Sequence, residues 1–240
     1  MQLTYQISKD TVSDVDATTS PIIQRDDGSR FTSSLGYTYS YDTRRTGLNP
    51  NAGILLEFGQ EYAGIGGGLE YIETTGKLTA QTRVLKEEVT LRAEFEFGAH
   101  TTLTGNSRIT ERFFLNSNRM RGFDGAGVGP RDVASTNEDA LGGNYFAVAR
   151  FEAEFPVGLP EEYGISGGLF LDVGSVWGLD DVVGAGGTIV DDSLNIRSSV
   201  GVSVFWDTQV GPLRFNFSKA IVKEDFDRER TFDLTVSTQF

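Results

Sequence analysis

Cysteine is absent from this sequence, and histidine, methionine and tryptophan are nearly absent, with one, two and two residues among 240. Without cysteine, the chain can form neither a disulfide framework nor a thiolate metal site. No run of 18 apolar residues occurs, so we expect no membrane-spanning helix. The formal net charge is −13 and the chain has no basic stripe, which argues against nucleic acid as a partner.

Hydrophobic residues make up 38% of the chain, which is less than in an ordinary globular domain. Two kinds of chain have such a deficit: a disordered chain, and a barrel whose lumen is polar and filled with water. Aromatic residues make up 11% of the chain, and this content argues against disorder.

The apolar residues alternate with polar residues along much of the chain. The final segment, TFDLTVSTQF, is the clearest example, and segments 89–98 and 195–206 show the same pattern. A period of two residues predicts β-strands with one apolar face. The pattern fits a soluble sandwich that buries this face, and it fits a membrane barrel whose apolar face meets lipid.

The connections between the expected strands alternate between long and short. Residues 8–30 and 99–142 and the segment GLDDVVGAGGTIVDDSL form long loops, whereas TRRTGLNPN, PVGLPEEYG and TQVGP form short turns. Short turns on one rim and long loops on the other are typical of an outer-membrane barrel. We therefore predict an all-β fold, a transmembrane antiparallel β-barrel. The ten expected strands lie near residues 2–8, 31–43, 52–62, 67–85, 89–98, 143–155, 164–177, 195–207, 211–222 and 230–240.

The longest loop contains NRMRGFDGAGVGPRD, which resembles the loop-six motif of the BamA family of outer-membrane insertases. That motif is an Arg-Gly-aromatic tripeptide, and Arg121, Gly122 and Phe123 occupy its positions. The segments ITERFFLNSN, LGGNYFAVARFEAEFPVGLP, GLFLDVGSVWG and GPLRFNFSKAI also resemble the family in the same order. We expect Gly122 to let the backbone turn tightly and Phe123 to pack as an anchor.

The resemblance implies a sixteen-stranded barrel preceded by periplasmic POTRA domains. Residues 1–240 are then expected to be a partial outer-membrane β-barrel of about ten C-terminal strands, with the POTRA domains and the first strands absent. The lack of a signal peptide agrees with this expectation, because Met1 is followed at once by the strand-like QLTYQIS. The implied location is the bacterial outer membrane. The implied partners are the lipid bilayer, nascent outer-membrane β-barrel proteins and, in the full-length parent, the lipoproteins of the assembly machine.

In the family, the loop enters the barrel lumen and its arginine meets acidic residues on two neighbouring strands. The matching positions here are Glu152 and Asp172. Alternation supports this placement, because Phe151 and Leu171 suit lipid, which leaves both carboxylates facing the lumen. We expect Arg121 to bind both carboxylates in a partly dehydrated lumen. The alternative is that the loop is exposed and the two carboxylates merely line a wet pore.

The end of the chain carries a second signal. Phe232, Leu234, Val236 and Phe240 share the apolar face of the final segment. A terminal aromatic residue preceded by alternating apolar residues resembles the targeting signal of outer-membrane proteins generally. In the BamA family the last strand forms a seam with the first strand, so we assign these four residues to the seam strand. They also fit an ordinary last strand.

Other motifs do not point to catalysis. The segment GISGG at 164–168 fits the GxSxG pattern of hydrolases, but no helix is expected after it. The only histidine, His100, precedes that segment and is expected in the longest loop. The aspartates of LDDVVGAGGTIVDDS do not match the spacing of an EF-hand. We therefore predict no catalytic residue, no metal site and no cofactor.

Several function classes remain at this point. We infer a non-enzymatic insertase that folds β-barrel proteins into the bacterial outer membrane. One alternative is a passive channel, lined by Arg92, Glu94, Arg197 and Arg214. The others are a soluble β-sandwich binding module, which should need no detergent, and a TamA-type or two-partner secretion translocator of the same superfamily.

Overall fold

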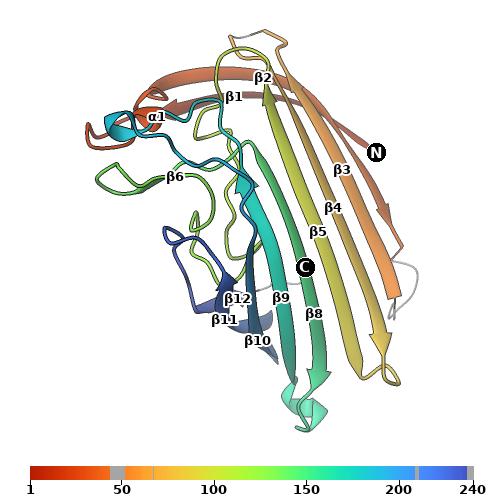
Figure 1. The fold of residues 1–240 in the computed structure, drawn as a ribbon. Coiled ribbons are helices and arrows are strands. Elements are labelled where there is room, and N and C mark those ends of the chain that lie inside the picture. Colours follow the sequence, from red (N-terminus) through yellow and green to blue (C-terminus); the bar gives the residue numbers. More distant parts are fainter. Residues whose placement is uncertain (44–51, 67, 209–210, 237–240) are drawn as a thin grey trace.

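The computed structural model describes residues 1–43, 52–66, 68–208 and 211–236 (Figure 1). Within these residues, ten strands form one antiparallel sheet in which every strand pairs with its neighbours in chain order. The predicted all-β class and the ten expected strands are confirmed. The strands are β1 (Gln2–Val12), β2 (Gly28–Asp42), β3 (Ala52–Ala63), β4 (Tyr71–Val84), β5 (Val89–Thr102), β8 (Tyr145–Pro156), β9 (Ile165–Trp177), β10 (Arg197–Thr208), β11 (Gly211–Val222) and β12 (Phe232–Val236).

Five short elements lie in the connections, and the alternation of the sequence did not predict them. A single turn of helix, α1 (Pro21–Gln24), separates β1 from β2. Two-residue strands, β6 (Arg131–Asp132) and β7 (Asp139–Ala140), pair with each other between β5 and β8. The 3-10 turns η1 (Glu161–Tyr163) and η2 (Ala185–Gly187) follow β8 and β9. In the described ranges, no helix has the length and apolar character needed to cross a bilayer.

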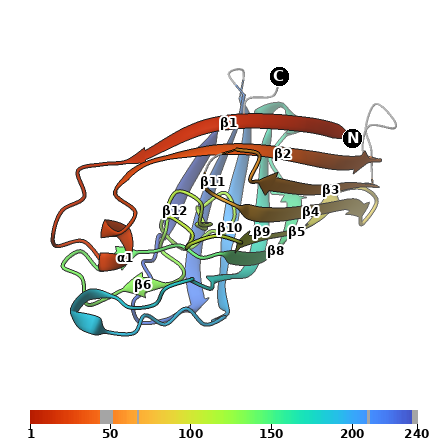
Figure 2. The same ribbon diagram turned by 90° about the horizontal axis from the view of Figure 1, so that it is seen from above.

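The sheet is strongly curved, and in the described part of the chain β1 and β12 form its two edges (Figures 1 and 2). The connection between β5 and β8, residues 103–144, runs along the concave side of the sheet (Figure 2). It carries the Arg-Gly-Phe tripeptide, and we call it the motif loop. A loop of this length that lies against a sheet needs many partners for its backbone and side chains.

The long loops that the sequence predicted and the short turn PVGLPEEYG are present, but the connection between β3 and β4, residues 64–70, is also short, so the alternation is not strict. The chain takes 15 residues, 13–27, to pass from β1 to β2, whereas four residues, 85–88, join β4 to β5. The connection of residues 178–196 after β9 is long, and that of residues 157–164 after β8 is short. Most of the predicted turn TRRTGLNPN and part of TQVGP lie outside the described residues. The three long connections thus lie at one rim of the sheet, and the short connections 85–88 and 157–164 lie at the other.

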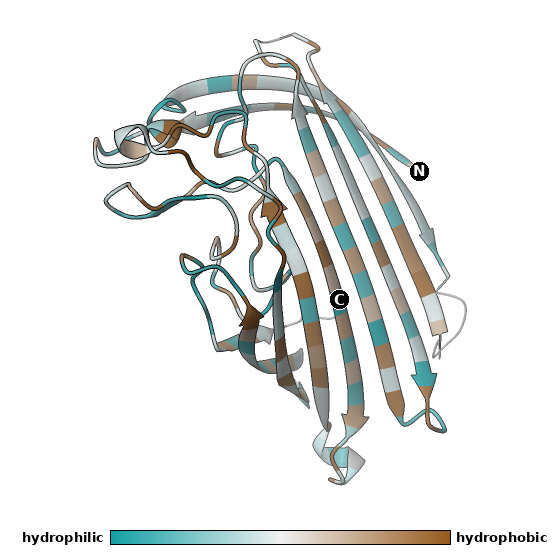
Figure 3. Cartoon of the chain, viewed as in Figure 1, coloured by the Kyte–Doolittle hydropathy of each residue, from teal (hydrophilic) through white to brown (hydrophobic). Residues whose placement is uncertain are grey.

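The two faces of each strand differ sharply in character, as the alternating colours of Figure 3 show. On β9, Leu169 and Leu171 are 54% and 39% exposed. Phe170 and Asp172, which alternate with them and point to the other face, are buried. A soluble sandwich would bury the leucine face. A face of exposed leucine, isoleucine and phenylalanine side chains on successive strands instead matches the lipid-facing surface of a membrane barrel. Exposed apolar side chains on these strands include Leu35, Ile54, Leu78, Phe95, Phe151, Leu171, Val202, Phe217 and Leu234.

This face predicts a depth-dependent response to charge. Leu171 lies midway along β9, so we expect Leu171→Arg to destabilise the protein by about 2–4 kcal/mol in lipid vesicles. Leu159 is similarly exposed, at 50%, but lies in a short connection at the rim. Leu159→Arg is therefore expected to cost only about 0–1 kcal/mol. Urea unfolding in vesicles measures both values, and equal costs for the two variants would contradict a lipid-facing β9.

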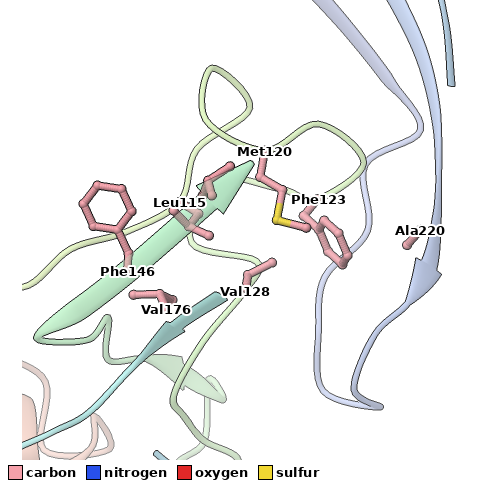
Figure 4. Close-up of a cluster of buried hydrophobic side chains, with 8 residues drawn as sticks. Leu115, Met120, Phe123, Val128, Phe146, Val176 and Ala220 are labelled. Atoms are coloured by element: carbon pink, nitrogen blue, oxygen red, sulfur yellow. The ribbon is translucent and has the colours of Figure 1, made fainter. Parts of the chain in front are cut away.

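The main cluster of buried apolar side chains lies between the motif loop and the concave face of the sheet (Figure 4). A second cluster joins Ile22, Leu141 and Val190, which come from three different connections at the long-loop rim. The motif loop is therefore packed against the sheet and against neighbouring connections. The main cluster comprises Leu115, Met120, Phe123 and Val128 from the motif loop, and Phe146, Val148, Val176 and Ala220 from the sheet.

One prediction about the motif loop was wrong. The loop was expected to begin at residue 99 and to contain His100, but β5 continues to Thr102. The backbone amide of His100 donates to the carbonyl of Asn144 at 2.7 Å, which extends the strand pairing. The imidazole is 1% exposed and its ring centroid lies 4.6 Å from that of Tyr71. Polar residues around position 100 concealed this extension in the sequence.

Candidate functional site

The guanidinium of Arg121 lies between two strands on the concave side of the sheet. Its Nε donates to Oδ2 of Asp172 at 2.7 Å, and its Nη2 donates to Oδ1 of Asp172 at 2.5 Å. Its Nη1 donates to Oε2 of Glu152 at 2.7 Å. The three side chains are only 5%, 0% and 8% exposed. The structure therefore brings together the arginine and both carboxylates that the sequence singled out.

The strand register explains how the two carboxylates meet one loop residue. Glu152 on β8 pairs with Phe170 on β9, and Arg150 pairs with Asp172. Glu152 and Asp172 are therefore diagonal neighbours on the same face of the sheet. The guanidinium of Arg121 lies over the ring of Phe170, with its central carbon 3.6 Å from the ring centroid. Charge pairing and a cation–π contact together fix its position.

Glu152 is shared by three arginines. Besides Arg121, the guanidinium of Arg92 donates to Oε1 at 3.2 Å, and Arg214 donates to Oε2. Asp172 accepts a third hydrogen bond, from the backbone amide of Arg121 at 3.0 Å. A buried charge is tolerated only when it is paired and its remaining hydrogen-bonding capacity is filled. This arrangement meets that condition, and what it does physically is hold the motif loop in one position.

Gly122 occupies a position that other residues cannot adopt without strain. Its φ is +89°, and a Cβ added there would lie 2.7 Å from the Cβ of Ser199 on β10. The hydroxyl of Ser199 donates to the carbonyl of Arg121 at 2.5 Å. The backbone therefore approaches β10 closely at the tripeptide, and glycine supplies both the conformation and the space.

Phe123 is 1% exposed and packs in the main apolar cluster between the motif loop and the sheet. Its backbone forms an isolated antiparallel bridge with Glu229, in the connection between β11 and β12. The three residues of the tripeptide thus have separate tasks. Arg121 binds the carboxylates, Gly122 permits the close approach, and Phe123 fills the space beneath the loop.

The expected seam strand is β12, at the edge of the sheet. Phe232 and Leu234 are 45% and 48% exposed on the apolar face, and the ring of Phe232 lies 5.3 Å from that of Phe217 on β11. Val236 is the last described residue, and its backbone pairs with β11. Phe240 lies outside the described residues. The described part of β12 therefore has the alternation that the sequence predicted.

A family model described as the Omp85 superfamily domain matches residues 1–240. The chain belongs to the Omp85 superfamily. The family resemblance stated from the tripeptide and its flanking segments is confirmed. Omp85 membership, together with the apolar face of the sheet, places the chain in the outer membrane.

Two curated proteins with the same name resemble this Omp85 chain. "Outer membrane protein assembly factor BamA" of Neorickettsia risticii (strain Illinois) is 31% identical over 241 residues, which cover 100% of this chain and 32% of that protein. The protein of that name from Neisseria meningitidis serogroup B (strain ATCC BAA-335 / MC58) is 26% identical over 213 residues, covering 80% of this chain and 27% of that protein. The chain thus spans about a third of their length or less.

A solved structure supports the fold. The crystal structure of BamA from Haemophilus ducreyi lacking POTRA domains 1–3 matches with a TM-score of 0.72 and 19% identity, over 90% of this chain and 44% of that chain. A further relative, matched over a shorter stretch, is the "Sorting and assembly machinery component 50 homolog" of Xenopus tropicalis, 29% identical over 133 residues, or 54% of this chain and 27% of that protein. The chain therefore has the fold of an Omp85 barrel.

The sequence did not predict all the residues that hold the tripeptide in place. Arg92 and Arg214 were considered only as the wall of a channel, and Ser199 was not assigned a role. Their inward position in the alternation was the available signal, but alternation does not reveal which lumen residues touch a loop. In the structure, Arg92 and Arg214 line a cavity of about 240 Å³ beside Arg121 and Glu152.

The motif loop of this Omp85 chain is also tied down at the long-loop rim. Asp180, in the connection after β9, accepts hydrogen bonds from the backbone amide of Ser107 at 2.6 Å and from Asn144 at 3.1 Å. Partial burial raises the pKa of the Asp180 carboxyl, but the hydrogen bonds from Ser107, Thr102 and Asn144 outweigh it and hold the pKa below its ordinary value. The carboxylate therefore stays ionised while it links these segments.

Proposed function

We propose that this chain is the barrel part of an insertase that folds β-barrel proteins into the outer membrane. The observation that carries the proposal is the 31% identity, along the whole chain, to a protein named as an outer membrane protein assembly factor. The buried network of Arg121 supports it, because that network fixes the tripeptide that led to the family.

The physical problem for such an insertase is the backbone of an unfolded client. In hydrocarbon, an unpaired strand edge leaves N–H and C=O groups without partners, at a cost of several kcal/mol each. A strand edge of the insertase can pair with the client so that bare backbone never meets lipid. In the described part of the chain, β12 pairs with β11 alone and offers its other edge. We propose that this edge is the template.

The motif loop has a mechanical role in this proposal. Arg121 joins the loop to β8 through Glu152 and to β9 through Asp172. The loop therefore braces the middle of the sheet while the edge at β12 opens and accepts a client strand. Such a role needs no bond-breaking chemistry, so we also propose that the chain is not an enzyme.

The alternatives fit the lumen less well. All four residues proposed to line a passive channel are paired with an opposite charge. Arg92 pairs with Glu154, Glu94 with Lys77, and Arg197 with Asp227. Arg214 pairs with Glu152, which it shares with two other arginines. A TamA-type or two-partner secretion translocator shares the superfamily, but two of the curated relatives carry the name of an assembly factor. We further propose that the complete protein works with lipoprotein partners of an assembly machine, as well as with client proteins.

Depletion of the complete gene product tests the proposal. We expect the amounts of other β-barrel proteins in the outer membrane to fall while their unfolded precursors accumulate. The purified protein in liposomes should accelerate folding of a denatured barrel protein relative to empty liposomes. Steady conductance across planar bilayers without any acceleration of client folding would instead identify a channel.

A further inference from the structure

A second enclosed ion pair lies near the end of the chain. Arg197, the first residue of β10, donates from Nε to Oδ2 of Asp227 at 3.0 Å and from Nη2 to Oδ1 at 3.2 Å. The side chains are 1% and 0% exposed. Arg197 also donates to the carbonyl of Asn195 at 2.7 Å, and Asp227 accepts the backbone amide of Glu224 at 2.8 Å. This bidentate pair fixes one point of the connection between β11 and β12.

The three residues after this point form a short ladder with residues 122–124 of the motif loop. Phe123 and Glu229 are directly opposite each other in an antiparallel bridge. Backbone hydrogen bonds of 2.9 Å and 3.1 Å flank the bridge on its two sides. In such a pair the two Cα atoms approach most closely. The ladder consists of Gly122, Phe123 and Asp124 in the motif loop and Arg228, Glu229 and Arg230 in the connection.

The ladder leads directly into the last strand. The carbonyl of Arg230 accepts the hydroxyl of Ser218 on β11 at 3.1 Å, and the carbonyl of Thr231 accepts the backbone amide of Ser218 at 2.9 Å. β12 begins at the next residue, Phe232. The start of the last strand is therefore held by the tripeptide on one side and by β11 on the other.

We propose that Arg197 and Asp227 form a latch that positions the last hairpin, residues 211–236, on the motif loop. The pair pins the connection at the residue before the ladder, so the tripeptide and the edge strand β12 keep a fixed relative position. This inference rests on the proposed function, in which β12 is the template edge. Arg197 and Asp227 are positioning residues, since they act on the edge through the ladder.

The latch has a clear mode of failure. Without Asp227, Arg197 is left buried without a counter-charge, which is strongly unfavourable. The connection then has to move so that water reaches the guanidinium, and the adjacent ladder opens. The tripeptide can remain bound to Glu152 and Asp172, because those contacts lie on β8 and β9. The expected defect is therefore a misplaced last strand with an intact motif network.

The rate of disulfide formation in the complete membrane protein reports whether the two sides of the ladder lie together. Asp124 and Arg228 are 55% and 52% exposed and face each other one position beyond the bridge, and the chain offers no native cysteine. We expect Asp124→Cys with Arg228→Cys to oxidise rapidly, because disulfide geometry requires close Cα atoms. Adding Asp227→Asn, which keeps the size but removes the charge, should slow oxidation about fivefold or more, as an opened ladder requires.

The second readout is rescue of function. Asp227→Ala is expected to lower client assembly about tenfold, because the last hairpin loses its fixed position. Oxidation of the engineered pair in this variant should restore assembly, and a reductant should remove it again. A merely structural defect would not respond to the cross-link. Lys223→Ala is the matched control, since Lys223 forms an exposed pair with Glu229 in the same connection and should have little effect.

Each outcome decides the proposal. Normal assembly by Asp227→Ala overturns it, and so does a folded variant that the cross-link fails to rescue. If Asp227→Ala does not fold, as judged by mobility in unheated gels, an unchanged oxidation rate in Asp227→Asn overturns it. Normal client levels after depletion of the unaltered protein would refute the proposed function instead, while the oxidation rates would still report whether the latch holds the ladder.

Discussion

We expect cells that depend on an Arg121→Glu variant to lose assembly of other outer-membrane β-barrel proteins, as the proposed function requires. The substitution places a third carboxylate beside Glu152 and Asp172 and removes the cation that pairs with both. Loss of one partner from a buried ion pair costs about 3–5 kcal/mol. That is a large share of the stability of an ordinary domain. We expect the motif loop to leave the concave face, so the brace between β8 and β9 is lost.

Two other variants make the test specific. Arg121→Lys keeps the charge but cannot bind Asp172 through two donors in a planar fork, so we expect partial loss of assembly. Arg119→Ala removes a neighbouring arginine whose side chain is 36% exposed and pairs with Glu96 at 3.1 Å. Glu96 is 15% exposed, and the Arg119 guanidinium also lies 4.6 Å from the ring centroid of Phe146. These partly exposed contacts contribute about 1–2 kcal/mol, less than the Arg121 network, so assembly should fall far less than in Arg121→Glu.

The measurement compares the amounts of several client barrel proteins in the outer membrane at equal amounts of each variant. Protease sensitivity of the motif loop, measured on intact membranes, shows whether the loop has moved. Normal client levels in cells that carry Arg121→Glu would refute the bracing role of the network. Equal losses in Arg121→Glu and Arg119→Ala would show that charge in the loop matters but the buried network does not.

The strands could be predicted well because polar and apolar residues alternate within each strand, and this alternation shows which face is buried. On β9, lipid accepts Leu169 and Leu171 while the concave side accepts Asp172, so polar and apolar residues must alternate. The same rule located all ten strands of the sheet to within a few residues. It failed at the end of β5, because polar residues there occupy both faces of the strand: His100 is buried, whereas Thr101 on the other face is exposed.

The candidate site could be predicted only through the family resemblance and the strand faces together. Alternation placed Glu152 and Asp172 on the lumen side, but it carried no information about a partner fifty or thirty residues away. The resemblance supplied Arg121 as that partner. It did not supply Arg92 and Arg214 as further partners of Glu152. Arg92 lies outside the quoted segments, and Arg214 lies within GPLRFNFSKAI but was expected only to line a channel.

Contacts between connections left no signal at all in the sequence. The pairing of Arg197 with Asp227 joins a strand end to a loop 30 residues later. Arg197 was expected only to line a channel and Asp227 was given no role, so neither residue indicated the other. The cluster of Ile22, Leu141 and Val190 likewise draws one residue from each of three connections. Such contacts have no period and no fixed spacing, so only the assembled structure reveals them.

The second large effect is expected from Phe123→Ala. The ring of Phe123 is 1% exposed and fills the cluster between the motif loop and the sheet, beside Met120 and Val128 (Figure 4). Truncating a buried phenylalanine to alanine costs about 3–5 kcal/mol, because apolar contacts are lost and a cavity remains. We expect urea unfolding of the complete protein in lipid vesicles to show a loss of this size.

A matched control lies in the same loop. Val133 is 57% exposed, so Val133→Ala should change the unfolding free energy by no more than about 0.5 kcal/mol. Phe123→Leu, which fills most of the same space, should lose less than the alanine variant. If Phe123→Ala unfolds at the same urea concentration as the unaltered protein, the ring does not anchor the loop. Because Phe123 also sits in the ladder opposite Glu229, its loss should loosen the last hairpin, and client assembly should fall together with stability.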